Sequence, residues 1–490
     1  MTSSSRTVDV VVIGGGVVGC SILRELSRYD ASLALIERHP DICEGTSKAN
    51  SAIVHTGFDA PPGTLEARLL AEARELWPDV ITDLNIPYLQ TGAVMVATDD
   101  TEQAALHEEV IPKAEKNGVE LQRLTGEEVR DMAPYVTERA REGVLIEGEG
   151  VIDPFWTTRA YAESAVRNGA EAFLGQEVVA IDIEPSKITL RTSAGLTIEA
   201  KVVVNAGGLW ADEVARLAGD DSFRLTPRKG EFIITEDELN VSQIILPVPT
   251  KISKGILVTP IVFGGTLLGP TADDIEDKRD LGTTPDGLRR VRDGAAKLVP
   301  GAATASSIRQ FAGLRAVSST GEYIIGPSKV SRNLIHVAGI RSTGLSASPA
   351  IGRYAASLVR DTLGLSQRTV FHAALPEALS EEHADEGEVV CLCRSITKGE
   401  ILAAMRSPLP PRSLDGLKRR TGAMLGDCQG NICAVRIAEL FAKHLGRDPL
   451  SLEKHVAGSR LFVDGPDGDG SAGETRRGGA RAAELAVTSE

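Results

Sequence analysis

The sequence lacks two features that would point to a membrane or to nucleic acid. None of its apolar stretches reaches the ~18–20 residues that a membrane-spanning helix needs. Positive charge is also in deficit, because 53 Lys and Arg face 68 Asp and Glu, which gives a net charge of −15. A general nucleic-acid-binding protein needs a basic face against the phosphates, so this balance argues against that class. A local basic pocket for a small anion is still possible.

The N-terminus also lacks the pattern of a secretory signal. The apolar run that begins at Val10 is interrupted by three consecutive glycines, and no strongly basic segment precedes it. No internal repeat is evident. With 42% hydrophobic and 25% charged residues in 490, the chain is expected to be a cytoplasmic globular protein of roughly three domains, at most peripheral to a membrane.

Cysteine is scarce, and its distribution is uneven. Four of the six cysteines lie after residue 390, as Cys391-x-Cys393 and Cys428-x₄-Cys433. Cytoplasmic thiols stay reduced, so such a cluster indicates metal or redox chemistry before disulfides. Four thiolates can hold zinc or an iron–sulfur cluster. Zinc sites more often use C-x₂₋₄-C on both sides, so the C-x-C arm favours iron and sulfide, with structural zinc or a vestigial module as alternatives.

The first 37 residues predict a strand, a helix and a second strand. An apolar run at 8–13 ends in glycines, residues 17–27 have helical apolar spacing, and a short apolar run at 32–37 ends in an acid. A glycine motif lies between the first strand and the helix. This order is the context in which a GxGxxG motif indicates a dinucleotide site rather than an unrelated glycine-rich turn.

Each residue of this motif has a physical role. Gly14 allows the tight turn, Gly16 lets the backbone approach a pyrophosphate, and Gly19 lets helix and strand pack closely. The helix N-terminus faces the anion. Glu37 ends the second strand and can accept hydrogen bonds from both ribose hydroxyls. The motif predicts a dinucleotide without a 2′-phosphate, and does not by itself separate NAD from FAD.

Three later segments favour FAD. They are GTSKANSAIVHTGF at 45–58, NAGGLWA at 205–211, and the glycine-containing stretch at 339–344. All three are built from small residues that let backbone approach a ligand. Three such approaches suit a long, buried cofactor that carries an isoalloxazine ring.

These motifs carry a resemblance to a known family. On DVVVIGGGVVG, NSAIVHTGF, DPFWTTRAYAESAVRNGAE, VVNAGGLWA and IHVAGIRSTGLSASPAIG, the region 8–360 resembles the FAD-dependent oxidoreductases of the D-amino-acid oxidase type. Within that family it is most similar to glycerol-3-phosphate dehydrogenases and L-2-hydroxyglutarate dehydrogenases or oxidases. The segment VVCLCRSITKGEI with GDCQGNICAVRIAEL resembles the bacterioferritin-associated ferredoxin-like [2Fe–2S] domain, found at the C-terminus of the large subunit of anaerobic glycerol-3-phosphate dehydrogenase.

The resemblance implies an α/β fold in which a Rossmann-like FAD-binding domain is interleaved with an antiparallel β-sheet substrate domain, followed by a small helical [2Fe–2S] domain. The expected bounds are 1–365 for the oxidoreductase, with FAD-binding parts at about 1–80, 150–220 and 330–365 and substrate parts at about 81–149 and 221–329; 366–389 for a linker; 390–460 for the cluster domain; and 461–490 for a disordered tail.

The resemblance also implies which residues bind the cofactors. Cys391, Cys393, Cys428 and Cys433 would hold the cluster. Further FAD-binding candidates, beside the three glycines and Glu37, are Arg38, Thr46, Ser47, Ser51, Val178, Ala206, Gly207, Gly339, Gly344 and Leu345.

Oxidation of an alcohol at a flavin needs a base for the hydroxyl proton and cations for the acidic end of the substrate. His55 is the candidate base, with a structural role or a flavin contact as the alternative. Arg315 and Arg341 are candidate anion ligands, because a guanidinium binds carboxylate or phosphate through two donors. A surface salt bridge for Arg315 and ordering of the flavin loop for Arg341 are the alternatives.

The substrate is left open by the sequence. Where glycerol-phosphate dehydrogenases carry a lysine after the last strand, this chain has AGIRSTGLSASP, with arginine. Glycerol 3-phosphate and a 2-hydroxy acid such as 2-hydroxyglutarate both remain candidates. A flavin with a one-electron cluster favours a dehydrogenase that feeds a protein partner or a quinone, and association with a membrane through that partner is compatible with this. The alternatives are an amino or imino acid dehydrogenase and a non-catalytic electron-transfer subunit.

Overall fold

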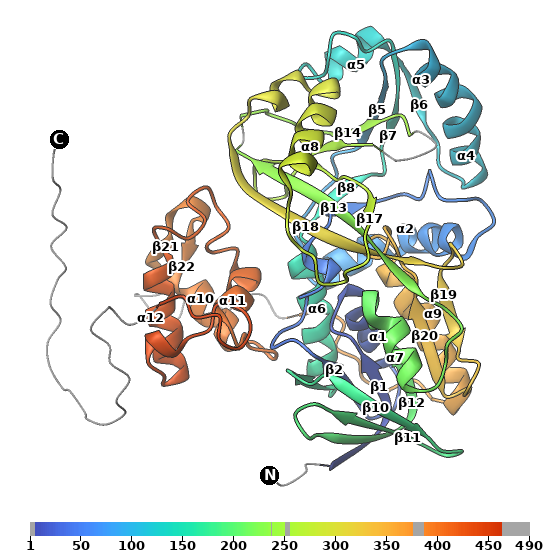
Figure 1. Cartoon of the computed structure of the whole chain (residues 1–490), viewed down its shortest axis with the longest axis vertical. Coiled ribbons are helices and arrows are strands. Elements are labelled where there is room, and N and C mark those ends of the chain that lie inside the picture. Colours follow the sequence, from blue (N-terminus) through green and yellow to red (C-terminus); the bar gives the residue numbers. More distant parts are fainter. Residues whose placement is uncertain (1–4, 237, 250–254, 376–386, 463–490) are drawn as a thin grey trace, which may run out of the picture.

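The computed structural model describes residues 5–236, 238–249, 255–375 and 387–462, and in it the chain forms two large sheets and a small helical module (Figure 1). The expected tail from 463 onward and part of the expected linker, 376–386, lie outside the described residues. Within the described ranges, no helix combines the length and the apolar character that crossing a bilayer requires.

The first sheet is the expected Rossmann-like sheet. Its parallel strands are β1 (Ser5–Ile13), β2 (Leu33–Glu37), β9 (Glu171–Leu174), β12 (Thr197–Asn205) and β20 (Leu334–Ala338). The middle residues of β1, β2 and β12 are fully buried, as a sheet covered on both faces requires. Helices α1 (Val17–Leu26), α2 (Leu65–Asp83), α6 (Pro154–Arg167) and α9 (Ser348–Leu363) share one apolar core with this sheet.

An antiparallel arm extends this sheet at one edge. Strands β10 (Val178–Ile183) and β11 (Ile188–Thr192) form this arm. Strand β12 is one continuous strand that belongs both to this arm and to the parallel part of the sheet. It stays continuous because β1 pairs along its whole length, while β11 and β20 (with β19, Ile324–Pro327) pair with its two halves.

The second sheet forms the other half of the main body (Figure 1). It is antiparallel except where β14 runs parallel to β5. Its strands are β5 (Ala93–Ala97), β6 (Gln122–Thr125), β7 (Glu142–Ile146), β13 (Leu225–Thr235), β14 (Ile244–Pro247), β15 (Leu257–Pro260), β16 (Thr266–Gly269), β17 (Asp273–Asp274) and β18 (Ser307–Ser318). The sequence did not predict β18, which pairs residue by residue with β13 and carries Arg315.

Shorter elements connect and cover the two sheets. A small sheet joins β3 (Ile53–Val54), β8 (Gly150–Ile152) and β4 (Tyr88–Leu89). The remaining helices of the oxidoreductase are α3 (Asp100–Ala105), α4 (Ile111–Lys116), α5 (Gly126–Met132), α7 (Ala211–Leu217) and α8 (Pro285–Leu298). Beyond α9, Arg368 donates to the carbonyls of Tyr29 and Ala31, so the chain stays on the FAD-binding part as it leaves that helix.

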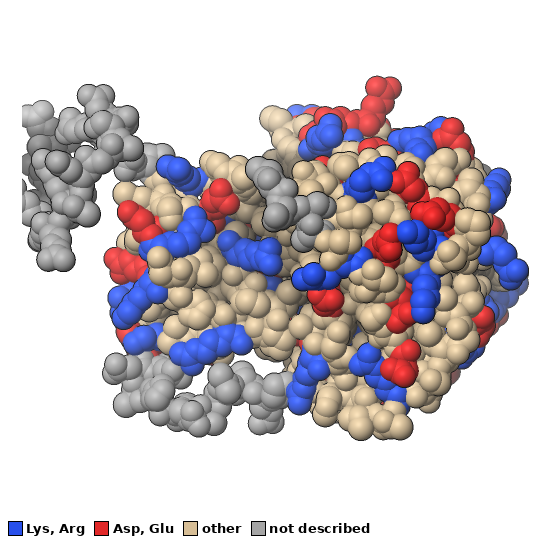
Figure 2. Space-filling model, turned by 90° about the horizontal axis from the view of Figure 1, so that it is seen from below, with Lys and Arg blue, Asp and Glu red and all other residues tan. Residues whose placement is uncertain are grey.

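The C-terminal module has a core of its own. It contains β21 (Val389–Cys391), β22 (Ile396–Thr397), α10 (Lys398–Met405), α11 (Leu414–Thr421) and α12 (Ala434–Leu445). Ile401, Leu417 and Ile437, one from each helix, are fully buried in a shared apolar cluster. The module forms a smaller lobe that abuts the main body (Figure 2).

Candidate functional site

The nucleotide turn brings three stretches of backbone closer than a side chain allows. Gly14 has φ +108°, and a Cβ there would lie 2.3 Å from the carbonyl oxygen of Ala206. A Cβ on Gly19 would lie 1.9 Å from the carbonyl oxygen of Gly14. β1, α1 and the Ala206-Gly207 turn after β12 are therefore locked together by glycine. The structure thus gathers these predicted FAD residues in one place.

The start of α1 provides donors for an anion. Gly16 is the N-cap and supplies no side-chain cap, while Ser47 accepts a hydrogen bond from the N–H of Val17 at 2.9 Å. Glu37 is buried and accepts from the N–H groups of Gly15 (2.6 Å) and His39 (2.8 Å). Burial raises its pKa against the opposing effect of these two donors. A helix start whose N-cap residue has no side chain, with a buried acid beside it, fits the pyrophosphate and ribose of FAD.

Arg38 lies next to Glu37, and its guanidinium stacks 4.3 Å above the ring of Trp210. That ring belongs to the turn that follows Ala206 and Gly207. Val178 begins β10 and packs in the apolar cluster that also holds Ile13 and Ile36, the last apolar residues of β1 and β2. Both residues therefore lie near the carboxyl ends of the Rossmann strands, and their contact with FAD stays a prediction.

The loop at 45–52 connects the nucleotide turn to the second sheet. Thr46 donates to the carbonyl of Leu314 at 2.6 Å, and Ser51 is half-buried further along the loop. A Cβ on Gly313 would lie only 2.0 Å from the carbonyl oxygen of Ala49. This loop therefore joins the start of α1 to β18, beside Arg315.

The loop after β20 approaches the same place. A Cβ on Gly344 would contact Val18 at 3.7 Å, and Leu345 is buried in the core of the Rossmann part. Gly339 has φ +70°, a conformation that favours glycine. The predicted FAD residues of 14–19, 46–47, 206–207 and 344–345 thus converge at the N-terminus of α1.

His55 is held by a carboxylate that the sequence did not reveal. Its Nδ1 lies 2.7 Å from Oε2 of Glu149. Glu149 is fully buried and also accepts from the backbone N–H and the hydroxyl of Thr56. The backbone N–H of His55 donates to Ser346, in the loop after β20. Glu149 stands in the turn between β7 and β8, and no local pattern marks it as the partner of a residue 94 positions away.

Arg315 is a largely enclosed cation whose hydrogen-bond acceptor is not a carboxylate. Its Nη2 donates to the carbonyl of Thr271 at 2.7 Å. Burial, with the nearby charge of Arg228, lowers its pKa to about 10, which still leaves it charged at neutral pH. This placement differs from that of Arg228, whose guanidinium donates to Asp274 at 2.6 Å. Arg315 therefore suits an incoming anion.

Arg341 has a different environment. Its Nη2 lies 3.4 Å from Oε2 of Glu66 on α2, and the other oxygen of Glu66 accepts from Thr343 at 2.7 Å. Glu66 is a second residue that the sequence did not single out. These contacts favour the interpretation that Arg341 orders the loop after β20, and its contact with substrate stays a prediction.

The four late cysteines come together in pairs. Cys391 lies close enough to Cys433 to affect the pKa of that thiol, and Cys393 and Cys428 lie close enough to affect each other's pKa. Within the described part of the chain, no three His, Cys, Asp or Glu side chains converge as the ligands of one metal ion would. Two thiol pairs fit a two-iron cluster better than a single tetrahedral zinc.

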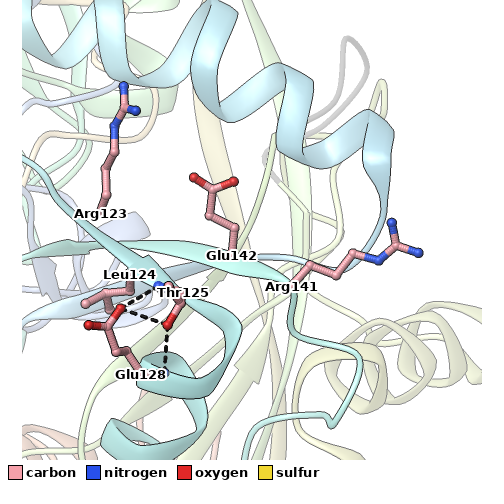
Figure 3. Close-up of a pocket in the computed structure, with 6 residues that line it drawn as sticks. All are labelled: Arg123, Leu124, Thr125, Glu128, Arg141 and Glu142. Carbon is pink, nitrogen blue, oxygen red and sulfur yellow. Dashed lines mark hydrogen bonds between the residues drawn. The ribbon is translucent and has the colours of Figure 1, made fainter.

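A separate surface depression lies far along the second sheet, between β6, β7 and α5 (Figure 3). It has a volume of about 290 Å³, and none of the predicted site residues lines it. The Thr125 and Glu128 side chains within it form the capping box of α5. They already serve a structural role, and we assign the depression no function.

Two known families match the chain, one in each part. Residues 9–358 match the family described as "FAD dependent oxidoreductase", and residues 389–443 match the "BFD-like [2Fe-2S] binding domain". The chain belongs to the FAD-dependent oxidoreductases and carries a [2Fe–2S] domain at its C-terminal side. FAD and a [2Fe–2S] cluster are its cofactors.

The chain is also similar to individual known proteins. A glycerol 3-phosphate dehydrogenase of Caloramator mitchellensis is 36% identical over 472 residues, which cover 93% of this chain and 98% of that protein. One of the subunits of the anaerobic glycerol-3-phosphate dehydrogenase of Escherichia coli (strain K12) is 26% identical, covering 90% and 89%. The solved structure of an L-alpha-glycerophosphate oxidase from Mycoplasma pneumoniae with FAD bound superimposes with a TM-score of 0.72 at 30% identity, covering 76% and 99%.

The cluster ligands can be tested by composition. We expect purified protein to contain iron and acid-labile sulfide at about two of each per chain, and the Cys428→Ser variant to lose most of both, because one thiolate of the set is gone. Iron and sulfide analysis with EPR of the reduced protein measures this. Cys20→Ala, a change at a buried cysteine in α1, is the matched control. One zinc per chain in place of iron would contradict the assignment.

Proposed function

We propose that this protein is a dehydrogenase that oxidises the hydroxyl group of glycerol 3-phosphate and delivers the electrons through its [2Fe–2S] domain to an acceptor. The observation that carries the proposal is the 36% identity to a glycerol 3-phosphate dehydrogenase over nearly the full length of both chains. The hydroxyl group of this substrate matches the His55–Glu149 pair as a proton acceptor. Its anionic end matches the enclosed guanidinium of Arg315.

FAD supplies the acceptor for the hydride that leaves the carbon. The chain supplies the proton acceptor. Because Glu149 accepts from Nδ1 of His55, it fixes the tautomer in which Nε2 carries the lone pair, and that atom is the one that takes the hydroxyl proton. Thr56 holds Glu149 in place through two hydrogen bonds.

Arg315 binds the anionic end of the substrate. Its guanidinium lies beside Gly230 of β13, where an added Cβ would come within 3.5 Å of Nη2 and 2.8 Å of Pro270, so this position requires glycine. The Thr271 carbonyl uses one donor of the guanidinium. The remaining N–H donors of the guanidinium match the geometry of a phosphate or a carboxylate.

The partner is proposed on the same basis. A [2Fe–2S] domain in an oxidoreductase, together with similarity to one subunit of an anaerobic dehydrogenase, supports transfer of electrons to a separate protein, and through it to a membrane quinone. We also propose a cytoplasmic location. None of the six cysteines, all of which lie within the described residues, forms a disulfide, and this supports a reducing compartment.

An anaerobic substrate panel tests the proposed reaction. We expect glycerol 3-phosphate to bleach the flavin absorbance, and the compounds 2-hydroxyglutarate, glycerol and several amino acids to do so much more slowly. Faster bleaching by a 2-hydroxy acid or an amino acid would move the assignment to that substrate class. Absence of bleaching with every compound would favour an electron-transfer subunit.

The anion-binding role of Arg315 predicts a loss of affinity. Arg315→Ala should raise the Kd of the substrate about 10- to 100-fold, because a hydrogen bond to a charged group contributes roughly 1.5–3 kcal/mol, while FAD content stays at one per chain. Anaerobic titration of flavin bleaching measures both. Arg289→Ala, on the exposed face of α8, is the control and should leave Kd unchanged. Unaltered affinity in Arg315→Ala would remove this residue from the site.

The base role of His55 predicts a loss of rate. His55→Gln should slow flavin bleaching by ~10²–10⁴, the usual contribution of a general base, at saturating substrate. Glu149→Gln should slow it by a smaller factor with little change in Kd, because it removes the partner that orients the ring. Stopped-flow absorbance measures the rate. Wild-type rates in both variants would show that the proton leaves by another route.

A further inference from the structure

The segment from Asp41 to Ser47 has two faces, and the first contacts the nucleotide turn. The N–H of Cys43 donates to the carbonyl of Gly15 at 2.9 Å. A Cβ on Gly15 would lie 3.1 Å from a methyl group of Ile42. Ser47, at the end of the segment, accepts from the first N–H of α1. The segment therefore supports the loop that contacts the pyrophosphate of FAD.

The second face contacts the cluster module. Arg420 on α11 binds Asp41 through both terminal nitrogens, at 2.5 and 2.8 Å, and its neighbour Arg419 binds Glu44. All four side chains are buried. Two buried ion pairs, one of them bidentate, thus join the module to the FAD-binding part. Removing one partner of such a pair would leave a buried charge without compensation and would destabilise the contact.

Close packing reinforces these ion pairs. A Cβ on Gly416 of α11 would lie 2.1 Å from Oδ2 of Asp41. Burial alone would raise the pKa of Glu44, yet contacts with His455, Arg419 and Lys48 hold that pKa well below its usual range. Glu44 is therefore charged at neutral pH, and both carboxylates are engaged by arginines when α11 is docked.

The same helix leads directly into the cluster ligands. Gly422 caps the end of α11, and Met424, two residues further on, is buried in one cluster with Cys391 and Cys433. A Cβ on Gly426 would lie 2.3 Å from Cβ of Cys393. The chain between α11 and Cys428 therefore packs directly against the cysteines, and α11 is the helix whose arginines contact Asp41 and Glu44.

We propose that α11 is a clamp that couples the two cofactors: the assembled cluster orders α11, Arg419 and Arg420 then hold the 41–47 segment against the nucleotide turn, and FAD is retained more tightly than in the cluster-free protein. Coupling between two sites is reciprocal, so bound FAD also stabilises the docked module. This proposal rests on the two cofactors and is independent of the substrate.

The first test leaves the sequence unchanged. The cluster is removed from the holoenzyme anaerobically with an iron chelator, and FAD release on dilution is followed by the rise in free-flavin fluorescence. We expect release to be at least about fivefold faster without the cluster, the lower end of typical coupling factors, and to return to its original rate after reconstitution with iron and sulfide. Identical release with and without the cluster would overturn the proposal.

The second test locates the coupling. Arg420→Gln should release FAD as fast as cluster-free protein while its own cluster is present, and removal of that cluster should add little, because both changes act through one contact. Arg436→Gln is the control, since Arg436 lies in the same module in an exposed ion pair with Glu388. Fully additive effects, or wild-type retention in Arg420→Gln, would contradict a clamp.

The outcomes separate this proposal from the proposed function. FAD retention that depends on the cluster, with no flavin bleaching by glycerol 3-phosphate, would keep the clamp and reject the substrate. Bleaching by glycerol 3-phosphate with unchanged FAD retention would keep the dehydrogenase and reject the clamp.

Discussion

The close backbone approach around Gly14 and Gly19 is the constraint on which the rest of the molecule depends. Only glycine permits this approach, because an added Cβ would lie 2.3 Å from Ala206 in one case and 1.9 Å from Gly14 in the other. The approach fixes the start of α1 against the ends of β1 and β12. The 41–47 segment and the loop after β20 then meet at that point, so one turn organises parts of the chain that are far apart in the sequence.

Local patterns in the sequence were enough to predict the parts of the site that local geometry determines. The spacing of Gly14, Gly16 and Gly19 predicted the strand–turn–helix, since each glycine is needed within a single turn. The paired cysteines at 391–433 predicted the kind of cofactor. The partners of these elements could not be predicted, because Glu149 reaches His55, and Arg420 reaches Asp41, only through the tertiary fold. β18 was missed because its outer half is partly exposed and gains its order from pairing with β13.

The protein buries charged side chains in two different ways. Asp41 and Glu44 are buried and satisfied by arginines of the same chain, so they hold two parts of the protein together. Arg315 donates to a backbone carbonyl, so its charge remains for a ligand. The first arrangement stabilises the fold, and we propose that the second gives specificity for an anion. The chain combines an FAD-dependent oxidoreductase with a [2Fe–2S] domain. Electrons taken from an anionic substrate must therefore pass from the FAD-binding part to the cluster module, which requires both kinds of contact.

The most direct test of this account follows both cofactors in one sample. Anaerobic protein is mixed with glycerol 3-phosphate and no external acceptor, flavin absorbance is recorded, and the same mixture is frozen for EPR. The account predicts that the two electrons of one substrate molecule are shared, so that flavin absorbance falls only partly while the EPR signal of the reduced cluster appears within the same turnover. A bleached flavin beside a cluster that stays oxidised, although dithionite reduces it, would contradict the claim that substrate electrons leave through the C-terminal module.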